Sequence, residues 1–120
     1  MKNILKVKVC GLKTIQDVLA AKHANFLGYV FYPKSKRFIK GEKAKELISR
    51  SHSGQKNVGL FVNSDNNFIE YMANYLNLDF VQLHGEETSE SIKMLKKKIT
   101  NVKIIKSISI ESKEDLKKAQ

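Results

Sequence analysis

The chain has 120 residues, which is the size of one small domain. It carries 22 Lys and Arg against 12 Asp and Glu, a formal net charge of +10, and 42% apolar residues. Its one cysteine excludes an internal disulfide, and no apolar run approaches the ~20 residues of a membrane span. The N-terminus also lacks the apolar block of a signal peptide. We therefore expect a soluble cytoplasmic protein with no membrane partner.

The positive charge by itself suggests a nucleic-acid partner, but its distribution argues against one. Arg37 and Arg50 are the only arginines, whereas phosphate and base recognition favours the guanidinium fork. The one dense basic run, residues 96–98, ends a helical stretch, where cations stabilise the helix dipole. We expect no nucleic-acid partner, and a small basic binding module is kept as an alternative function.

The first predicted element is a strand over residues 4–9, which ends at Cys10 and Gly11. The glycine marks a sharp exit, and Thr14 and Asp17 have the spacing of a capping box that starts a helix. The one thiol therefore lies at a junction between strand and helix, where α/β folds place reactive groups. The alternative for an isolated cysteine is a small residue that fills the core.

The rest of the chain alternates between strand and helix patterns. Apolar runs predict strands at residues 26–31, 58–62, 80–83 and 102–108, with a helix in each interval. A further capping box, from Ser112 to Asp115, begins a fifth helix. Continuous apolar runs are typical of parallel strands covered on both faces. The pattern predicts a single α/β domain over residues 1–120 with a parallel sheet.

Two architectures share this pattern: an open doubly wound sheet and part of a (βα)8 barrel. The open sheet fits the length, but the Gly-rich loop and paired aspartates that such folds carry after the first strand are missing. The pattern of elements alone leaves both architectures open.

In both architectures, functional side chains gather at the carboxyl ends of the strands. A thiol, a guanidinium, amides and an imidazole occupy those positions in this chain: Cys10, Arg37, Asn63, Gln82 and His84. Each has an ordinary structural role when taken singly, but their joint placement indicates a site. No ligand cluster with metal spacing accompanies them, so we expect no metal.

The segments around these positions resemble phosphoribosylanthranilate isomerases, a tryptophan-biosynthesis family with a (βα)8, or TIM, barrel. The matching motifs are residues 8–12 (KVCGL), 28–31 (GYVF) with 35–37 (SKR), 59–63 (GLFVN), 81–85 (VQLHG) and 102–106 (VKIIK). They follow the family's order across essentially the whole chain. One departure is Lys36, where the family usually has proline; we expect it to alter loop stiffness more than chemistry. The resemblance implies the N-terminal part of a TIM barrel, about four and a half βα units.

The resemblance also implies a reaction, the Amadori rearrangement of N-(5'-phosphoribosyl)anthranilate, an aminoaldose phosphate, to an aminoketose phosphate. Cys10 is then the general base, Arg37 pairs with the anthranilate carboxylate, and Gln82 and His84 line the substrate pocket. This small-molecule substrate needs no cofactor. A related barrel, indole-glycerol-phosphate synthase, fits less well, because it relies on lysine acid and base groups.

A (βα)8 barrel needs roughly 200–250 residues, so we expect this chain to form an incomplete one. By resemblance, the general acid is an aspartate on the sixth strand and the phosphate site follows strands seven and eight. Asp115 lies in a helix start and does not replace that aspartate. We expect unpaired edges on the first and fifth strands, self-association, and little isomerase activity for the chain alone. A non-catalytic remnant or half-barrel is the alternative.

Overall fold

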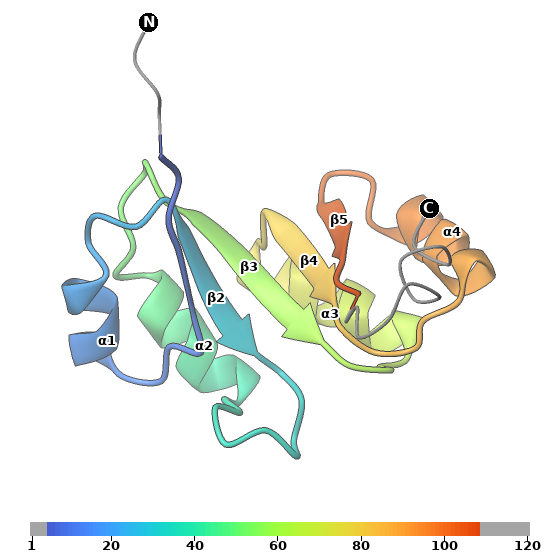
Figure 1. The fold of residues 1–120 in the computed structure, drawn as a ribbon, viewed down its shortest axis with the longest axis horizontal. Helices are drawn as coiled ribbons and strands as arrows, with labels where there is room; N and C mark the ends of the chain where they lie inside the picture. The colour runs from blue at the N-terminus through green and yellow to red at the C-terminus, as the bar shows by residue number, and fades with distance from the viewer. Residues whose placement is uncertain (1–4, 109–120) are drawn as a thin grey trace, which may run out of the picture.

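The computed structural model of the protein describes residues 5–108, which form an α/β fold (Figure 1). Strands and helices alternate in the order β1 (Lys8–Cys10), α1 (Ile15–Ala20), β2 (Phe26–Val30), α2 (Gly41–Ile48), β3 (Lys56–Phe61), α3 (Asn66–Leu76), β4 (Phe80–Leu83), α4 (Ser89–Lys98) and β5 (Lys103–Lys106). The predicted alternation is confirmed. The helix predicted from Ser112 lies outside the described residues. Within residues 5–108, no helix has the length and apolar character needed to cross a membrane.

Each strand pairs in parallel with the next strand along the chain, so the sheet order is β1-β2-β3-β4-β5. A doubly wound sheet reverses its strand order at a switch point, and this sheet has no reversal. Sequential parallel order is the arrangement of a TIM-barrel wall. The doubly wound alternative is therefore wrong, and the prediction of a partial barrel is confirmed.

The sheet is curved, because side chains on well-separated strands meet across one face. The Lys8 ammonium on β1 donates to the Gln82 side-chain oxygen on β4. In a flat sheet, three strand spacings of about 4.8 Å would separate these strands by roughly 14 Å. On the same face, the rings of Phe26 and Phe80 meet edge-on with centroids 5.6 Å apart.

We call this the inner face. The strand register places on it Lys8, Cys10, Phe26, Gly28, Val30, Lys56, Val58, Leu60, Phe80, Gln82, Lys103 and Ile105.

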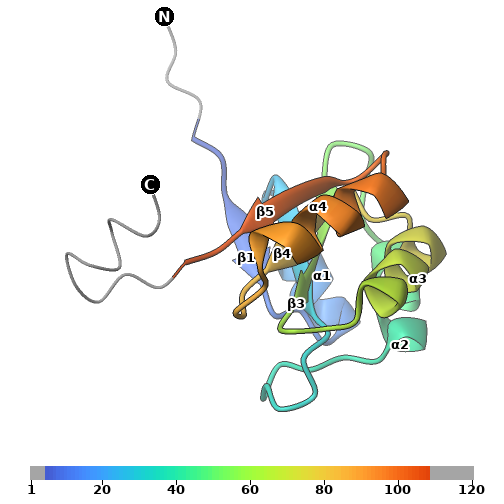
Figure 2. The ribbon, with the colours of Figure 1, turned by 90° about the vertical axis from the view of Figure 1, so that its right-hand side faces the viewer.

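The opposite, outer face of the sheet is covered by the helices. Leu27, Phe61 and Val81 alternate with inner-face residues and are fully buried there. Helix α2 packs beside α3, and α3 beside α4, along the sheet (Figure 2). Their buried contributions include Ala44 and Ile69. The main apolar core therefore lies between the sheet and the helices. The inner face and the carboxyl ends of the strands lie outside this core.

The first strand is shorter than the predicted 4–9 segment. Leu5 is 83% and Val7 43% exposed, and regular pairing begins only at Lys8. Within the described residues, β1 pairs only with β2, and β5 only with β4. Residues 5–7 therefore bury little apolar surface and gain ladder hydrogen bonds on one side at most. The prediction of two open sheet edges is confirmed for the described part of the chain.

Tyr29 carries one of two buried side-chain oxygens without a hydrogen-bond partner among the described residues, the other being Asn57 Oδ1. Its ring is fully buried beneath the helices, and its hydroxyl has no hydrogen-bond partner among the described residues. Burial raises the pKa of Tyr29 to about 12, because the phenolate loses its hydration. An unsatisfied buried hydroxyl of this kind lowers stability.

Replacement of this hydroxyl is therefore expected to stabilise the fold. Tyr29→Phe should raise the free energy of unfolding by about 1–3 kcal/mol, measured by urea unfolding with circular dichroism. Tyr71→Phe, at a ring on α3 that is 60% exposed, is the control and should change nothing measurable. A loss of stability in Tyr29→Phe would contradict the expectation and indicate a buried water that satisfies the hydroxyl.

Candidate active site

The rim formed by the carboxyl ends of the strands holds the predicted site residues. Cys10 is the last residue of β1, and Arg37 lies in the loop after β2. Asn63 follows β3, and His84 follows β4 directly. Because the strands are parallel, all four positions lie at the same end of the sheet. The rim divides into two parts, one around Cys10 and one around His84.

Cys10 projects from β1 onto the inner face opposite a glycine. Its register partner on β2 is Gly28, and a Cβ atom there would lie 2.9 Å from the Cys10 Sγ atom. Any larger residue at position 28 would therefore displace the thiol. The thiol is free and half-buried, so the alternative of a fully enclosed core residue is wrong.

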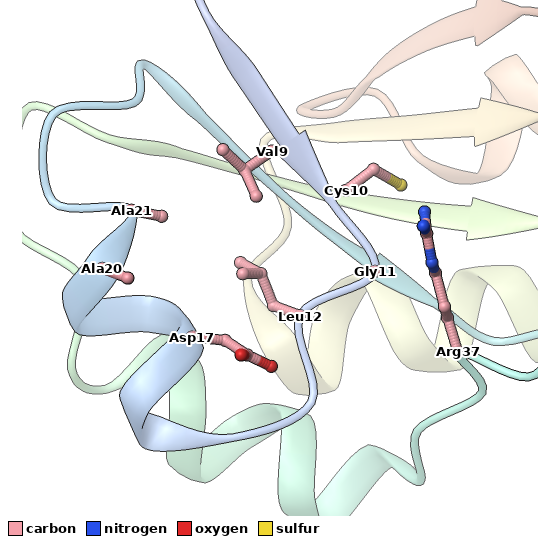
Figure 3. A pocket seen from close by; sticks show the side chains of 8 residues that line it. All are labelled: Val9, Cys10, Gly11, Leu12, Asp17, Ala20, Ala21 and Arg37. Carbon is pink, nitrogen blue, oxygen red and sulfur yellow. The ribbon is translucent and has the colours of Figure 1, made fainter.

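A second glycine makes room for Arg37. Gly11 has a φ of +88°, which L side chains rarely adopt, and a Cβ atom there would lie 2.3 Å from the Arg37 Cδ atom. The aliphatic stem of Arg37 therefore crosses the chain at Gly11. Figure 3 shows the Arg37 guanidinium and the Cys10 thiol on the same side of β1, with the guanidinium directed toward the thiol. Both residues border a pocket of about 340 Å³, but its other lining residues, such as Val9, Leu12 and Asp17, lie on the opposite side of β1 (Figure 3).

Local hydrogen bonds fix the loop that carries Arg37. The Arg37 amide donates to the Ser35 hydroxyl at 3.1 Å, and the Ile39 amide donates to the Val30 carbonyl at 3.0 Å. From the β1 side, the Lys13 ammonium donates to the Lys36 carbonyl at 3.2 Å. The loop is therefore tied to its own strand and to the segment after Gly11. Lys36 contributes to this tie through its backbone.

The predicted capping box at the start of α1 is confirmed. The Thr14 hydroxyl accepts from the Asp17 amide at 3.1 Å. The Asp17 carboxylate in turn accepts from the amides of Lys13 at 3.0 Å and Thr14 at 3.1 Å. The hydrogen bond from the Lys13 amide is the main reason that the pKa of Asp17 is lowered. This carboxylate, which also lines the Cys10 pocket, is therefore occupied in holding the turn.

Gln82 links the two parts of the rim. Its side-chain oxygen accepts from Lys8, and its Nε2 atom donates to the Ser107 hydroxyl at 2.7 Å. Its amide is thus oriented from both sides on the inner face. The prediction grouped Gln82 with His84, but His84 lies farther along, in a second pocket of about 620 Å³ with Asn63, Lys106 and Ser107.

Sequence reasoning missed two residues in the second part of the rim. Glu87 and Lys106 form an ion pair of 2.6 Å in which the Glu87 side chain is only 6% exposed. Glu86 and Glu87 are adjacent carboxylates after a turn glycine, so no pattern in the sequence separates the exposed one from the buried one. Lys106 was also missed, because the predicted strand ran to residue 108, whereas β5 ends at Lys106.

The comparison with known sequences identifies one family. Residues 7–120 match the family described as N-(5'phosphoribosyl)anthranilate (PRA) isomerase. The N-(5'-phosphoribosyl)anthranilate isomerase of Thermotoga petrophila is 36% identical over 118 residues, which cover 97% of this chain and 56% of the relative. The enzyme of that name from Caldanaerobacter subterraneus is 40% identical over 117 residues, or 96% and 55%. The chain thus spans about half the length of these curated relatives.

Solved structures agree with the sequence match. A phosphoribosyl anthranilate isomerase in complex with reduced 1-(o-carboxyphenylamino)-1-deoxyribulose 5-phosphate superposes with a TM-score of 0.90 at 34% identity. The match covers 97% of this chain and 59% of that one. The isomerase from Thermotoga maritima has the same TM-score and identity, with 97% and 56% covered. The chain therefore belongs to the N-(5'-phosphoribosyl)anthranilate isomerase family.

Proposed function

We propose that this chain supplies the general base and the carboxylate-binding side of a phosphoribosylanthranilate isomerase site. The observation that carries the proposal is that the Cys10 thiol and the Arg37 guanidinium lie on the same side of β1, each packed against a glycine. The reaction is the Amadori rearrangement of the aminoaldose phosphate to the aminoketose phosphate, and it belongs to tryptophan biosynthesis.

In this proposal, Cys10 acts as a thiolate and removes the proton from C2′ of the ring-opened iminium. The C2′–H electron pair becomes the enolamine double bond, and tautomerisation to the ketone follows. Arg37 holds the anthranilate carboxylate through parallel N–H···O bonds, which fixes the distance between the substrate and the thiol. The solved relative with a bound carboxyphenylamino compound supports a carboxylate-bearing ligand for this fold.

The remaining groups of the site are proposed to lie on strands beyond β1–β5. A general acid must protonate the furanose oxygen, and Asp17, the one carboxylate that lines the Cys10 pocket, is occupied by the capping box. The matched region covers 56% of the Thermotoga petrophila relative, so the family's barrel has further strands to contribute. Gln82 and His84 are proposed to line the substrate pocket on the far side.

The open strands suggest how this chain meets a partner. β1 and β5 each have one unpaired edge in the described part, and Ile105 on the inner face is 40% exposed. We propose that these edges pair with complementing strands, or with a second copy when complementing strands are absent. We propose a cytoplasmic location, because the free thiol of Cys10 suits a reducing compartment. We also propose that the chain has no nucleic-acid partner.

The roles of the two arginines provide a direct test. With the chain coexpressed beside the C-terminal part of a relative, isomerase turnover is followed by the loss of anthranilate fluorescence. Arg37→Ala should raise KM about 10–100-fold, which corresponds to the loss of a charge-assisted hydrogen bond. Arg50→Ala, at the other arginine, should leave KM unchanged. Equal effects of both substitutions would contradict a specific carboxylate site.

The base is tested in the same complemented enzyme. Cys10→Ala should lower kcat about 10²–10⁴-fold, because the general base is lost while Arg37 still binds substrate. Wild-type turnover in the Cys10→Ala variant would overturn the proposed role. Absence of turnover in the complemented wild type would instead favour a non-catalytic remnant.

Gly11→Ala tests whether substrate binding needs the Arg37 side chain to pack against Gly11. The added Cβ atom collides with the Arg37 stem, so we expect KM to rise as in Arg37→Ala, with a loss of stability from the left-handed φ. Gly54→Ala is the control, because the nearest atoms to a Cβ there belong to the His52 ring, 3.3 Å away, and not to Arg37. An unchanged KM in a folded Gly11→Ala protein would show that Arg37 does not need to pack against Gly11.

Self-association of the isolated chain is measured by sedimentation velocity over a wide range of concentration. We expect the mean mass to rise with concentration, because both sheet edges offer unpaired backbone groups. Ile105→Lys places a charge on the exposed inner face beside the β5 edge and should reduce the association. A monomer at all concentrations would contradict the proposal.

A further inference from the structure

A single carboxylate joins the ends of three neighbouring strands. The Glu87 Oε2 atom accepts from the Asn63 amide, after β3, at 2.8 Å. Its Oε1 atom accepts from the Gly85 amide, after β4, at 2.9 Å, and from the Lys106 ammonium of β5 at 2.6 Å. The carboxylate thus holds donors from three different strand ends at once.

Asn63 and Gly85 complete the arrangement. Asn63 lies in the left-handed region with φ of 51°, and its side-chain oxygen accepts from the Glu86 amide at 2.7 Å. A Cβ atom on Gly85 would lie 2.4 Å from that oxygen, so only glycine permits the approach. The Lys106 ammonium also donates to the Gly85 carbonyl. The segment after β4 is therefore held through both its amides and its carbonyl.

The charge state of Glu87 follows from these contacts. Burial raises the pKa of Glu87, but the hydrogen bonds from Lys106 and from the backbone amides outweigh it and hold the pKa below the ordinary value. A buried ion pair is a weak source of net stability, because both charges lose their hydration. Its geometric effect is the fixed relation between the three strand ends.

We propose that Glu87 is a positioning residue that holds His84 at the rim of the proposed isomerase site. His84 directly precedes Gly85, and its side chain lines the second pocket with Lys106 and Ser107. Glu87 also pairs with Lys106, which lines the same pocket, so that ammonium is engaged there, while His84, Glu86 and Ser107 line the pocket beside it. Only the expected effect on KM rests on the proposed function; the positioning of the strand ends by Glu87 does not.

The ionised state of Glu87 makes a prediction about pH. A folded-state pKa below the unfolded value gives stability that is present above the unfolded pKa, near 4.5, and is lost as pH falls through the folded value. The difference in unfolding free energy between wild type and Glu87→Gln should therefore shrink as pH falls below 4.5. The neighbouring Lys106, Glu86 and His84 are present in both proteins. A pH-independent difference would contradict an ionised Glu87.

Amide hydrogen exchange tests the positioning role without any assay of activity. In Glu87→Gln, one carboxylate oxygen becomes an NH₂ group, which cannot accept a hydrogen bond from the Asn63 or Gly85 amide. We therefore expect exchange of the Asn63, Gly85 and Glu86 amides to speed up about tenfold or more. The amide of Val81 in the core of β4 should keep its rate. Glu86→Gln, at the adjacent exposed carboxylate, is the matched control and should leave all of these rates unchanged.

Two results would overturn the proposal. One is faster exchange by the same factor across the whole sheet, and the other is unchanged exchange of the Gly85 and Glu86 amides. If Glu87→Gln does not fold, Lys106→Gln keeps the two amide contacts and should give a smaller increase at the same three amides. Unchanged rates in Lys106→Gln would then count against it.

Kinetics in the complemented enzyme test the consequence for His84. Glu87→Gln and His84→Ala should each raise KM more than they lower kcat, and the double variant should be no worse than His84→Ala. Additive effects would show that Glu87 does not act through His84. A complemented wild type without turnover would refute the proposed function, while the exchange result would still decide the positioning role.

Discussion

Parallel pairing in strict sequence order is the constraint on which the rest of this structure depends. It brings the carboxyl ends of all five strands to one rim, so side chains as distant in sequence as Cys10 and His84 share one surface. It also fixes the register in which Cys10 faces Gly28. The thiol has room only because of that pairing. A shift by one residue would turn Cys10 to the helix-covered face.

Much of the fold followed from the sequence, because apolar periodicity reports burial directly. The strands after β1 lie close to the predicted segments, since each is buried by neighbours on both sides or by helices. The first strand was overpredicted for the same reason. Leu5 and Val7 have strand composition but lie at an open edge, where composition alone cannot reveal that burial is lacking.

The candidate site was predictable in its positions and not in its contacts. Strand ends are visible in the sequence, so the places of Cys10, Arg37 and His84 at the rim could be predicted, while their roles stay predictions. Glu87 was missed, because its role depends on three donors that converge only in the folded chain. The contact between Lys8 and Gln82 also has no signature in the sequence, since it depends on the curvature of the sheet.

The inner face of the sheet carries three lysines, Lys8, Lys56 and Lys103, and no carboxylate among its strand residues. Any polypeptide that closes this wall into a barrel must hydrate, pair or bypass those ammonium groups, because burying them unpaired is costly. A complement would therefore have to match this face in charge as well as in shape. Two copies of the same wall, face to face, would bring six like charges together at low ionic strength.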